Sequence, residues 1–259
     1  IYYITMCYNC IVYTKEELSM DKDKLANKEK MITVSRKGNA FEYTSPAPGV
    51  HIYDNVWDGG MDFMRTLDAE GKFEREDYII DADGNPIPKE VGKQGVSAWV
   101  KSGDKDGRDE MLCEAFEEVV DSYQWHYDLD TRSREWWRIS KFKVGDYFGM
   151  HPDDSYGTPR TVSMVYYPND AYEGGELEFI HFGVKIKPKA NQLFLFPSSY
   201  IYEHRITDIG EGEPRYTMVA FFCNIDEVEK QKRLNKLPNP YKAKLSYISE
   251  LNKQQFKIE

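Results

Sequence analysis

The sequence predicts a mainly β domain with flanking helices, an antiparallel sandwich or barrel. From residue 142 to 222 the chain reads as short segments rich in Tyr, Phe, Val and Ile, separated every few residues by Gly, Pro, Asn or Asp. This pattern is typical of such folds. Ahead of these segments, residues 109–127 place apolar side chains at spacings of three and four, with acidic side chains between them. They predict an amphipathic helix that packs against the outside of the β core.

We predict a single domain over residues 1–259, because no internal repeat or flexible linker divides the chain. Its expected parts are an N-terminal lead-in (1–46, extended or a short helix), helical support with an insertion (47–133), the β core (134–223) and a helical C-terminal segment (224–259). The second part begins with a strand at 50–57 and a helix at 61–71. Its polar stretch, 72–108, contains an Asp-Gly turn of the hairpin type. This stretch is interpreted as a substrate lid or as surface decoration.

Composition restricts the class of protein. Hydrophobic residues make up 41% and charged residues 30%, and 44 acidic against 34 basic residues give a net charge of −10. The acidic balance argues against a nucleic-acid binder. No apolar run approaches the roughly 18 residues that a membrane span needs, and no signal peptide is recognised at the N-terminus. Four cysteines, with Cys7 and Cys10 interpreted as incidental rather than zinc ligands, favour a reducing cytoplasm. The oligomeric state stays open.

Among the five histidines, two lie in a context that suggests a metal site. His151 and Asp153 fall in a β segment, where residues two apart face the same side, and His204 falls on another predicted strand. Two imidazoles and one carboxylate form the facial triad of non-haem iron(II) oxygenases, which leaves coordination positions open. The same groups can hold zinc. The remaining histidines are interpreted as structural: His51, His126 and His181.

Arg215 is the candidate anion-binding residue. It begins a strand of Val, Phe and Tyr that we expect to pair with the strand of His204 through the turn at 208–214. An arginine in such surroundings needs an anion, and its planar fork suits a carboxylate. Thr217 lies two residues further on and should face the same side. The alternative is an exposed arginine paired with Glu211 or Glu213.

Six short sequence motifs, called blocks here, follow one another between residues 136 and 222. They are F-x-V-G-D-Y-F-x-x-H-P-D, R-T-V-S-M-V-Y-Y-P-N, E-G-G-E-L-E-F, L-F-L-F-P-S-S, H-R-I-T-D-I and P-R-Y-T. Together they resemble the iron(II)- and 2-oxoglutarate-dependent dioxygenases, specifically the prolyl 4-hydroxylase-like branch. The resemblance implies a double-stranded β-helix (jelly-roll) core, buttressed by helices on one sheet.

The resemblance also implies roles for individual residues. His151, Asp153 and His204 would bind iron(II). Arg215 would hold the distal carboxylate of the cosubstrate 2-oxoglutarate, helped by Thr217 and by Tyr167, for which a core aromatic role is the alternative. O2 and ascorbate are the further cofactors that the family implies.

The implied activity is hydroxylation of an unactivated C–H bond, most specifically that of a peptidyl proline, as in procollagen-proline 4-dioxygenases. The expected partner is therefore a proline-containing protein or peptide. Two alternatives remain: the same chemistry on a free amino acid, another protein side chain or a nucleobase, and a non-catalytic jelly-roll binding module. Two departures from the family pattern bear on the substrate. Phe148 stands where relatives often have tyrosine, and Arg215 stands where many animal prolyl 4-hydroxylases have lysine.

Overall fold

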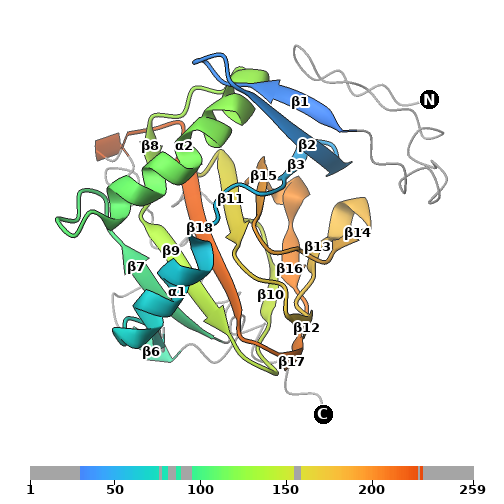
Figure 1. Cartoon of the computed structure of the whole chain (residues 1–259). Coiled ribbons are helices and arrows are strands. Elements are labelled where there is room, and N and C mark those ends of the chain that lie inside the picture. Colours follow the sequence, from blue (N-terminus) through green and yellow to red (C-terminus); the bar gives the residue numbers. More distant parts are fainter. Residues whose placement is uncertain are drawn as a thin grey trace.

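The computed structural model describes residues 30–75, 78–80, 86–88, 95–154, 159–226 and 228–229. Two antiparallel sheets face each other, and two helices cover the outer face of the larger sheet (Figure 1). The helices are α1 (Gly60–Ala69) and α2 (Arg108–His126). The predicted jelly roll with helices on one sheet is therefore present.

The larger sheet contains most of the strands. In spatial order they are β1 (Met31–Val34), β2 (Ala40–Ala47), β3 (Val50–Tyr53), β15 (Gln192–Pro197), β11 (Val162–Tyr167), β18 (Arg215–Cys223), β9 (Trp137–Phe142), β7 (Val96–Val100) and β4 (Glu74–Arg75), with β8 (Ser133–Arg134) also on β18. The smaller sheet consists of β10 (Phe148–His151), β16 (His204–Ile206), β13 (Leu177–Phe179) and β14 (Val184–Ile186). Two further pairs are β12 (Tyr172–Gly174) with β17 (Ile209–Gly212), and β5 (Tyr78–Ile80) with β6 (Pro86–Pro88). Short 3-10 turns occupy Ile180–Phe182 and Tyr200–Tyr202.

Side chains alternate along each strand, so the two faces of the larger sheet pack against different parts of the protein. On the outer face, Trp137 and Ile139 of β9 pack with Phe116 of α2 in one core cluster. On the inner face, Phe194 of β15 packs with Phe179 of the smaller sheet in a second cluster. The space between the sheets is therefore lined by inner-face residues only.

A half-buried carboxylate joins α2 to the sheet. Asp109, in the first turn of α2, accepts hydrogen bonds from the guanidinium of Arg134 (2.5 Å), from the indole nitrogen of Trp137 (2.9 Å) and from the backbone nitrogen of Gly103 (2.9 Å). Charge-assisted bonds of this kind are strong when solvent is excluded. They fix the helix against β8 and β9.

Most predicted elements are confirmed. All the strands expected between 142 and 222 are present, as are both helices, the strand at β3, and the Asp-Gly hairpin as the β5–β6 pair. The pairing of two segments was not predicted. The lead-in, expected to be extended or a short helix, contains β1 and β2, and the stretch 72–108 contributes β4 and β7, all in the larger sheet. Edge strands carry polar and apolar side chains on their exposed sides, which hides the alternation in the sequence.

Several expectations fall outside the described residues, including Cys7, Cys10 and nearly all of the C-terminal segment. Within the described part, Cys113 and Cys223 are not joined in a disulfide. None of the helices in the described ranges is long and apolar enough to cross a membrane.

His51 is a core side chain on the outer face of β3. It is 1% exposed, stacks on Tyr43 at 3.7 Å between ring centroids, and forms a hydrogen bond through Nε2 with the hydroxyl of Tyr127 (2.8 Å). Burial, with a smaller contribution from His126, lowers the pKa of His51 from 6.5 to about 3. The imidazole is therefore neutral in the folded protein across the physiological pH range.

We expect His51 to make the folded state sensitive to mild acid. Between pH 6.5 and about pH 3 the unfolded chain binds a proton at this residue and the folded chain does not. The stabilisation is therefore complete above pH 6.5 and is lost as pH falls, by up to about 1.4 kcal/mol per pH unit. Urea unfolding of wild type and of His51→Gln at several pH values should show a shallower acid slope for the variant. Equal slopes would contradict the assignment.

Candidate metal centre

The three predicted metal ligands come together between the sheets. His151, at the end of β10, lies directly opposite His204 of β16 in the antiparallel register, and Asp153 follows two residues after His151. One ligand atom from each residue lies within 4.8 Å of the others. Nε2 of His151 is 3.6 Å from one carboxylate oxygen of Asp153, and Nε2 of His204 is 3.9 Å from the other. This spacing can accommodate one metal ion.

Backbone carbonyls fix the orientation of both imidazoles. Nδ1 of His151 lies 2.8 Å from the carbonyl oxygen of Gly149, and Nδ1 of His204 lies 2.9 Å from that of Tyr202. A carbonyl only accepts, so Nδ1 carries the proton in each ring and Nε2 keeps its lone pair for a metal. Burial, followed by the neighbouring His204, lowers the pKa of His151 to about 4. The neutral, metal-binding form thus predominates at neutral pH.

Asp153 is held by two buried serines. Ser163 of β11 donates a 2.6 Å hydrogen bond to one carboxylate oxygen of Asp153, and its own oxygen lies 2.8 Å from the hydroxyl of Ser198. Both serines are at most 1% exposed. Oδ2 of Asp153 is both the oxygen that accepts from Ser163 and the one near His204, whereas Oδ1 lies near His151. The serines therefore fix the orientation of the carboxylate beside both histidines.

Arg215 opens β18 and is completely buried. Its Nε donates to the carbonyl oxygen of Gly175 at 3.2 Å, but within the described part of the chain Nη1 and Nη2 have no hydrogen-bond partner. The guanidinium carbon lies 5.1 Å from the ring centroid of Tyr167 and 6.0 Å from that of Tyr172. The hydroxyls of these two tyrosines are also buried without a partner there.

These four groups form a coherent set of donors. Burial raises the pKa of both tyrosines, so their hydroxyls stay protonated. Two guanidinium nitrogens and two hydroxyls can together satisfy the lone pairs of one carboxylate. A buried arginine without an anion is strongly unfavourable. The residues present therefore fit the distal carboxylate of a dicarboxylic ligand such as 2-oxoglutarate.

A glycine turn makes room for the arginine. Gly174, the last residue of β12, and Gly175, which follows it, have φ values of 60° and 64°, in the left-handed region. A Cβ on Gly175 would lie 2.9 Å from Cδ of Arg215, and one on Gly174 would lie 2.0 Å from the carbonyl oxygen of Asp208. The two glycines of the E-G-G-E block are therefore required, because any side chain there would collide with Arg215 or with the backbone at Asp208.

The predicted site residues are largely assembled as expected. Tyr167 and Thr217 line the same cavity as the three metal ligands. Arg215 lies behind that cavity, against the rings of Tyr167 and Phe142. The alternative of an exposed, ion-paired Arg215 is wrong because the side chain is fully buried and its two outer nitrogens are unpaired.

One structural expectation was wrong. The strands of His204 and Arg215 do not pair: β16 joins β10 and β13 in the smaller sheet, whereas β18 joins β11, β9 and β8 in the larger sheet. Between them β17 turns away to pair with β12. The metal ligands and the arginine therefore approach the same space from opposite sheets.

Sequence reasoning missed two residues of the site, Tyr172 and Ser163. The signal for Tyr172 is weak: it stands one residue before the E-G-G-E block. Ser163 lies inside the block that carries Tyr167, and its alternation with Val165 and Tyr167 places it on the inner face.

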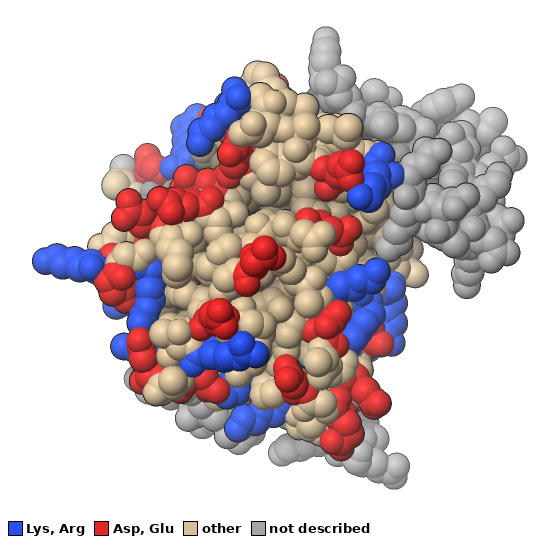
Figure 2. Space-filling view, in the orientation of Figure 1, with Lys and Arg blue, Asp and Glu red and all other residues tan. Residues whose placement is uncertain are grey.

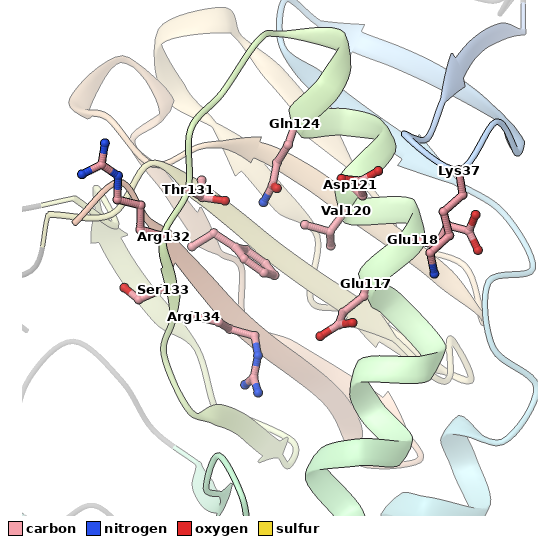
Figure 3. A pocket seen from close by; sticks show the side chains of 11 residues that line it. Lys37, Glu117, Glu118, Val120, Asp121, Gln124, Thr131, Arg132, Ser133 and Arg134 are labelled. Carbon is pink, nitrogen blue, oxygen red and sulfur yellow. The ribbon is translucent and has the colours of Figure 1, made fainter. Parts of the chain in front are cut away.

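A larger cavity lies away from this site, between α2 and residues 131–134 (Figure 3). Glu117, Gln124 and Arg134 are among its lining side chains. Arg134 is paired with Asp109, and none of the lining residues is a histidine or cysteine. Size alone therefore does not identify the functional cavity.

Comparisons with known proteins agree with this geometry. Residues 116–223 match the model of the 2OG-Fe(II) oxygenase superfamily. The search of curated proteins finds no match. Among solved structures, a prolyl-4-hydroxylase from Pseudomonas putida aligns with a TM-score of 0.53 at 19% identity, over 69% of this chain and 94% of its own.

Two further solved structures are similar. A viral collagen prolyl hydroxylase from Paramecium bursaria Chlorella virus-1, in complex with 2OG, has a TM-score of 0.51 at 17% identity, covering 67% of this chain and 95% of its own. A Trichoplax adhaerens prolyl hydroxylase, in complex with a peptide from the hypoxia inducible factor oxygen degradation domain, has a TM-score of 0.53 at 18% identity, covering 73% and 87%. At these identities the likeness establishes the fold.

The fold is that of the double-stranded β-helix class, and the His-Asp-His group between its sheets could hold a metal ion. Residues 116–223 match the 2OG-Fe(II) oxygenase superfamily, and the chain has the fold of the prolyl 4-hydroxylases, as the sequence blocks predicted. Iron(II) and 2-oxoglutarate are the cofactors that this family implies.

We expect Ser163 to act as a positioning residue for Asp153. Ser163→Ala removes the 2.6 Å hydrogen bond and should weaken metal binding about tenfold, as changes around metal ligands typically do. Ser163→Thr keeps the hydroxyl and should restore most of the affinity. Calorimetric titration of the metal-free protein with Mn²⁺ measures the metal affinity of both variants. Unchanged affinity in Ser163→Ala would show that the serine only fills space.

Proposed function

We propose that this protein is an iron(II)- and 2-oxoglutarate-dependent dioxygenase that hydroxylates a peptidyl proline. The observation that supports it most strongly is that the metal-binding triad shares a cavity with Tyr167, and that Arg215, packed on the ring of Tyr167, has two guanidinium nitrogens without a hydrogen-bond partner in the described part of the chain. A non-catalytic binding module does not require this combination. The prolyl substrate is supported by the neighbours in fold, each described as a prolyl hydroxylase.

In this proposal each residue has a defined task. His151, Asp153 and His204 bind iron(II) on one side and leave the other positions to ligands. Arg215, with Tyr167, Tyr172 and Thr217, holds the distal carboxylate of 2-oxoglutarate and so fixes its direction. When bound, iron(II) and 2-oxoglutarate supply with O2 the oxidising power for hydroxylation, and the cosubstrate leaves as succinate and carbon dioxide.

The surroundings of the site suit this chemistry. Phe148 stacks on His151 at 4.0 Å between ring centroids, and Phe196 packs edge-on against His204 at 5.2 Å. Val165, Leu177 and other apolar side chains line the same cavity. Such a lining excludes water from the reacting centre and strengthens the electrostatic contacts there. Ascorbate, as a reductant that keeps the iron in its ferrous state, is part of the proposal.

Succinate release from 2-oxoglutarate, with added iron(II) and ascorbate, tests the chemistry without knowledge of the substrate. We expect turnover by wild type and none by Asp153→Ala. Arg215→Ala should raise the KM for 2-oxoglutarate about a hundredfold and Tyr172→Phe about tenfold, since each removes hydrogen bonds to a charged group. Tyr166→Phe is the matched control, because that hydroxyl donates to the carbonyl of Trp57 on the other face of the sheet. Absence of turnover in wild type would refute the proposal.

The prolyl substrate has a separate test. Incubation with proline-rich peptides, followed by mass spectrometry with fragmentation, should show the gain of one oxygen atom on a proline residue. The same reaction mixtures should contain free proline and peptides without proline as controls. Oxygen on free proline, on another side chain or on a nucleobase would replace the peptidyl-proline assignment and leave the oxygenase chemistry intact.

A further inference from the structure

One lysine of the smaller sheet differs from its basic neighbours. Lys185 pairs with the carboxylate of Glu176 at 3.7 Å. Arg205 pairs with that of Glu178 at 2.6 Å. Basic and acidic side chains therefore lie beside each other over this sheet (Figure 2). Lys187, the residue directly after β14, instead folds back onto the backbone of the protein.

The ammonium group of Lys187 makes three contacts with β12. Nζ donates hydrogen bonds of 2.6 Å to the carbonyl oxygens of Tyr172 and Gly174. It also lies 3.8 Å from the ring centroid of Tyr172, within the range of a cation–π contact. An exposed lysine usually extends its charged end into solvent. Lys187 is exposed along its length, but these contacts hold its charged end against the strand.

The segment that Lys187 contacts surrounds the guanidinium of Arg215. The carbonyl oxygen of Gly175 accepts from Nε of Arg215 at 3.2 Å, and the ring centroid of Tyr172 lies 6.0 Å from the guanidinium carbon. A Cβ on Gly175 would lie 2.9 Å from Cδ of Arg215 and 3.0 Å from Cε2 of Tyr172. Backbone, ring and arginine are therefore in close contact, and a shift of residues 172–175 would move the donors apart.

The charge of Lys187 is not free to act as a second receptor for an anion. Burial, the largest influence, lowers the pKa of Lys187, and Arg215 lowers it further. Three nearby carboxylates raise it, those of Glu176, Asp170 and Glu173. Because acidic groups balance the lysine and carbonyl oxygens occupy its donors, its contribution is to the position of the segment rather than to the local charge.

We propose that Lys187 is a positioning residue for 2-oxoglutarate: it holds residues 172–175 so that the hydroxyl of Tyr172 and the guanidinium of Arg215 receive the same carboxylate. This proposal rests on the function proposed above and deepens it. Donors that folding has already ordered bind an anion more tightly than donors that binding must order. Lys187 therefore raises the affinity for the cosubstrate without touching it.

Calorimetric titration of the Zn²⁺-loaded protein with 2-oxoglutarate and with oxalate tests this proposal. Both carboxylates of oxalate chelate the metal, so oxalate reports on the metal end of the site alone. Lys187→Met keeps an apolar stem and removes both hydrogen bonds. It should weaken the binding of 2-oxoglutarate about tenfold and leave that of oxalate unchanged. Lys187→Arg can still donate to two carbonyls and should restore most of the affinity; an equal loss in this variant would overturn hydrogen bonding to the segment as the cause.

Lys185 offers a matched control. It stands two residues earlier, carries the same charge and pairs with Glu176 rather than with β12. Lys185→Met should bind both ligands as wild type does. A tenfold loss of 2-oxoglutarate affinity in this variant too would indicate a general effect of charge, and the proposal would be wrong.

A double-mutant cycle tests the route through Tyr172. Independent effects of Lys187→Met and Tyr172→Phe would multiply to a loss of about a hundredfold in affinity for 2-oxoglutarate, since each is expected to cost about tenfold. If the lysine acts by placing the tyrosine hydroxyl, the double variant should lose clearly less than that. A full multiplicative loss would contradict the proposed route.

The outcomes separate this proposal from the proposed function. If wild type binds 2-oxoglutarate and Lys187→Met binds it equally well, the role of Lys187 is overturned and the oxygenase function stands. If Lys187→Met loses oxalate and 2-oxoglutarate alike, the substitution disrupts the whole site and the specific role is again overturned. If wild type binds neither ligand, both the oxygenase function and the role of Lys187 are overturned.

Discussion

A completely buried guanidinium with two unpaired nitrogens is the constraint on which the site depends. Burial of an uncompensated charge is among the most unfavourable arrangements in a protein interior. Arg215 and the unpaired hydroxyls of Tyr167 and Tyr172 create this arrangement within one small volume. An anion would pair with these donors, so the fold provides a binding site whose occupation compensates the buried charge. A ligand of this kind, bound to the folded state alone, also stabilises that state.

The two sheets divide the site between them. The histidines lie opposite each other on β10 and β16 of the smaller sheet, while Arg215 begins β18 of the larger sheet. Their separation is set by the aromatic core between the sheets, where Phe179 packs against Phe196 at 5.0 Å between centroids. The geometry of metal and anchor is therefore a consequence of core packing, which a close-packed interior holds within narrow limits.

The sequence predicted the parts of the site that local motifs encode. His151 and Asp153 stand two residues apart in a β context, and the block around Arg215 marks its strand by composition. The sequence could not predict which strands pair within each sheet. Pairing between distant strands depends on register and burial rather than on the adjacent turn. The expected pairing of the His204 and Arg215 strands failed for this reason. β1 and β2 were missed because Thr33 and Tyr43 face inward while Ile32 faces solvent, which blurs the pattern.

The residues that sequence reasoning missed act through contacts made only in three dimensions. Tyr172 reaches Arg215 across the β12–β17 pair, and Ser163 reaches Asp153 from β11. Alternation along β9 likewise assigns Trp137 to the helix-side core and Arg138 to the inner face. Because core and inner face are separated residue by residue along one strand, inner-face side chains can change without disturbing the core. Substrate preference in this fold can therefore vary while the helix-supported sheet and the metal site stay fixed.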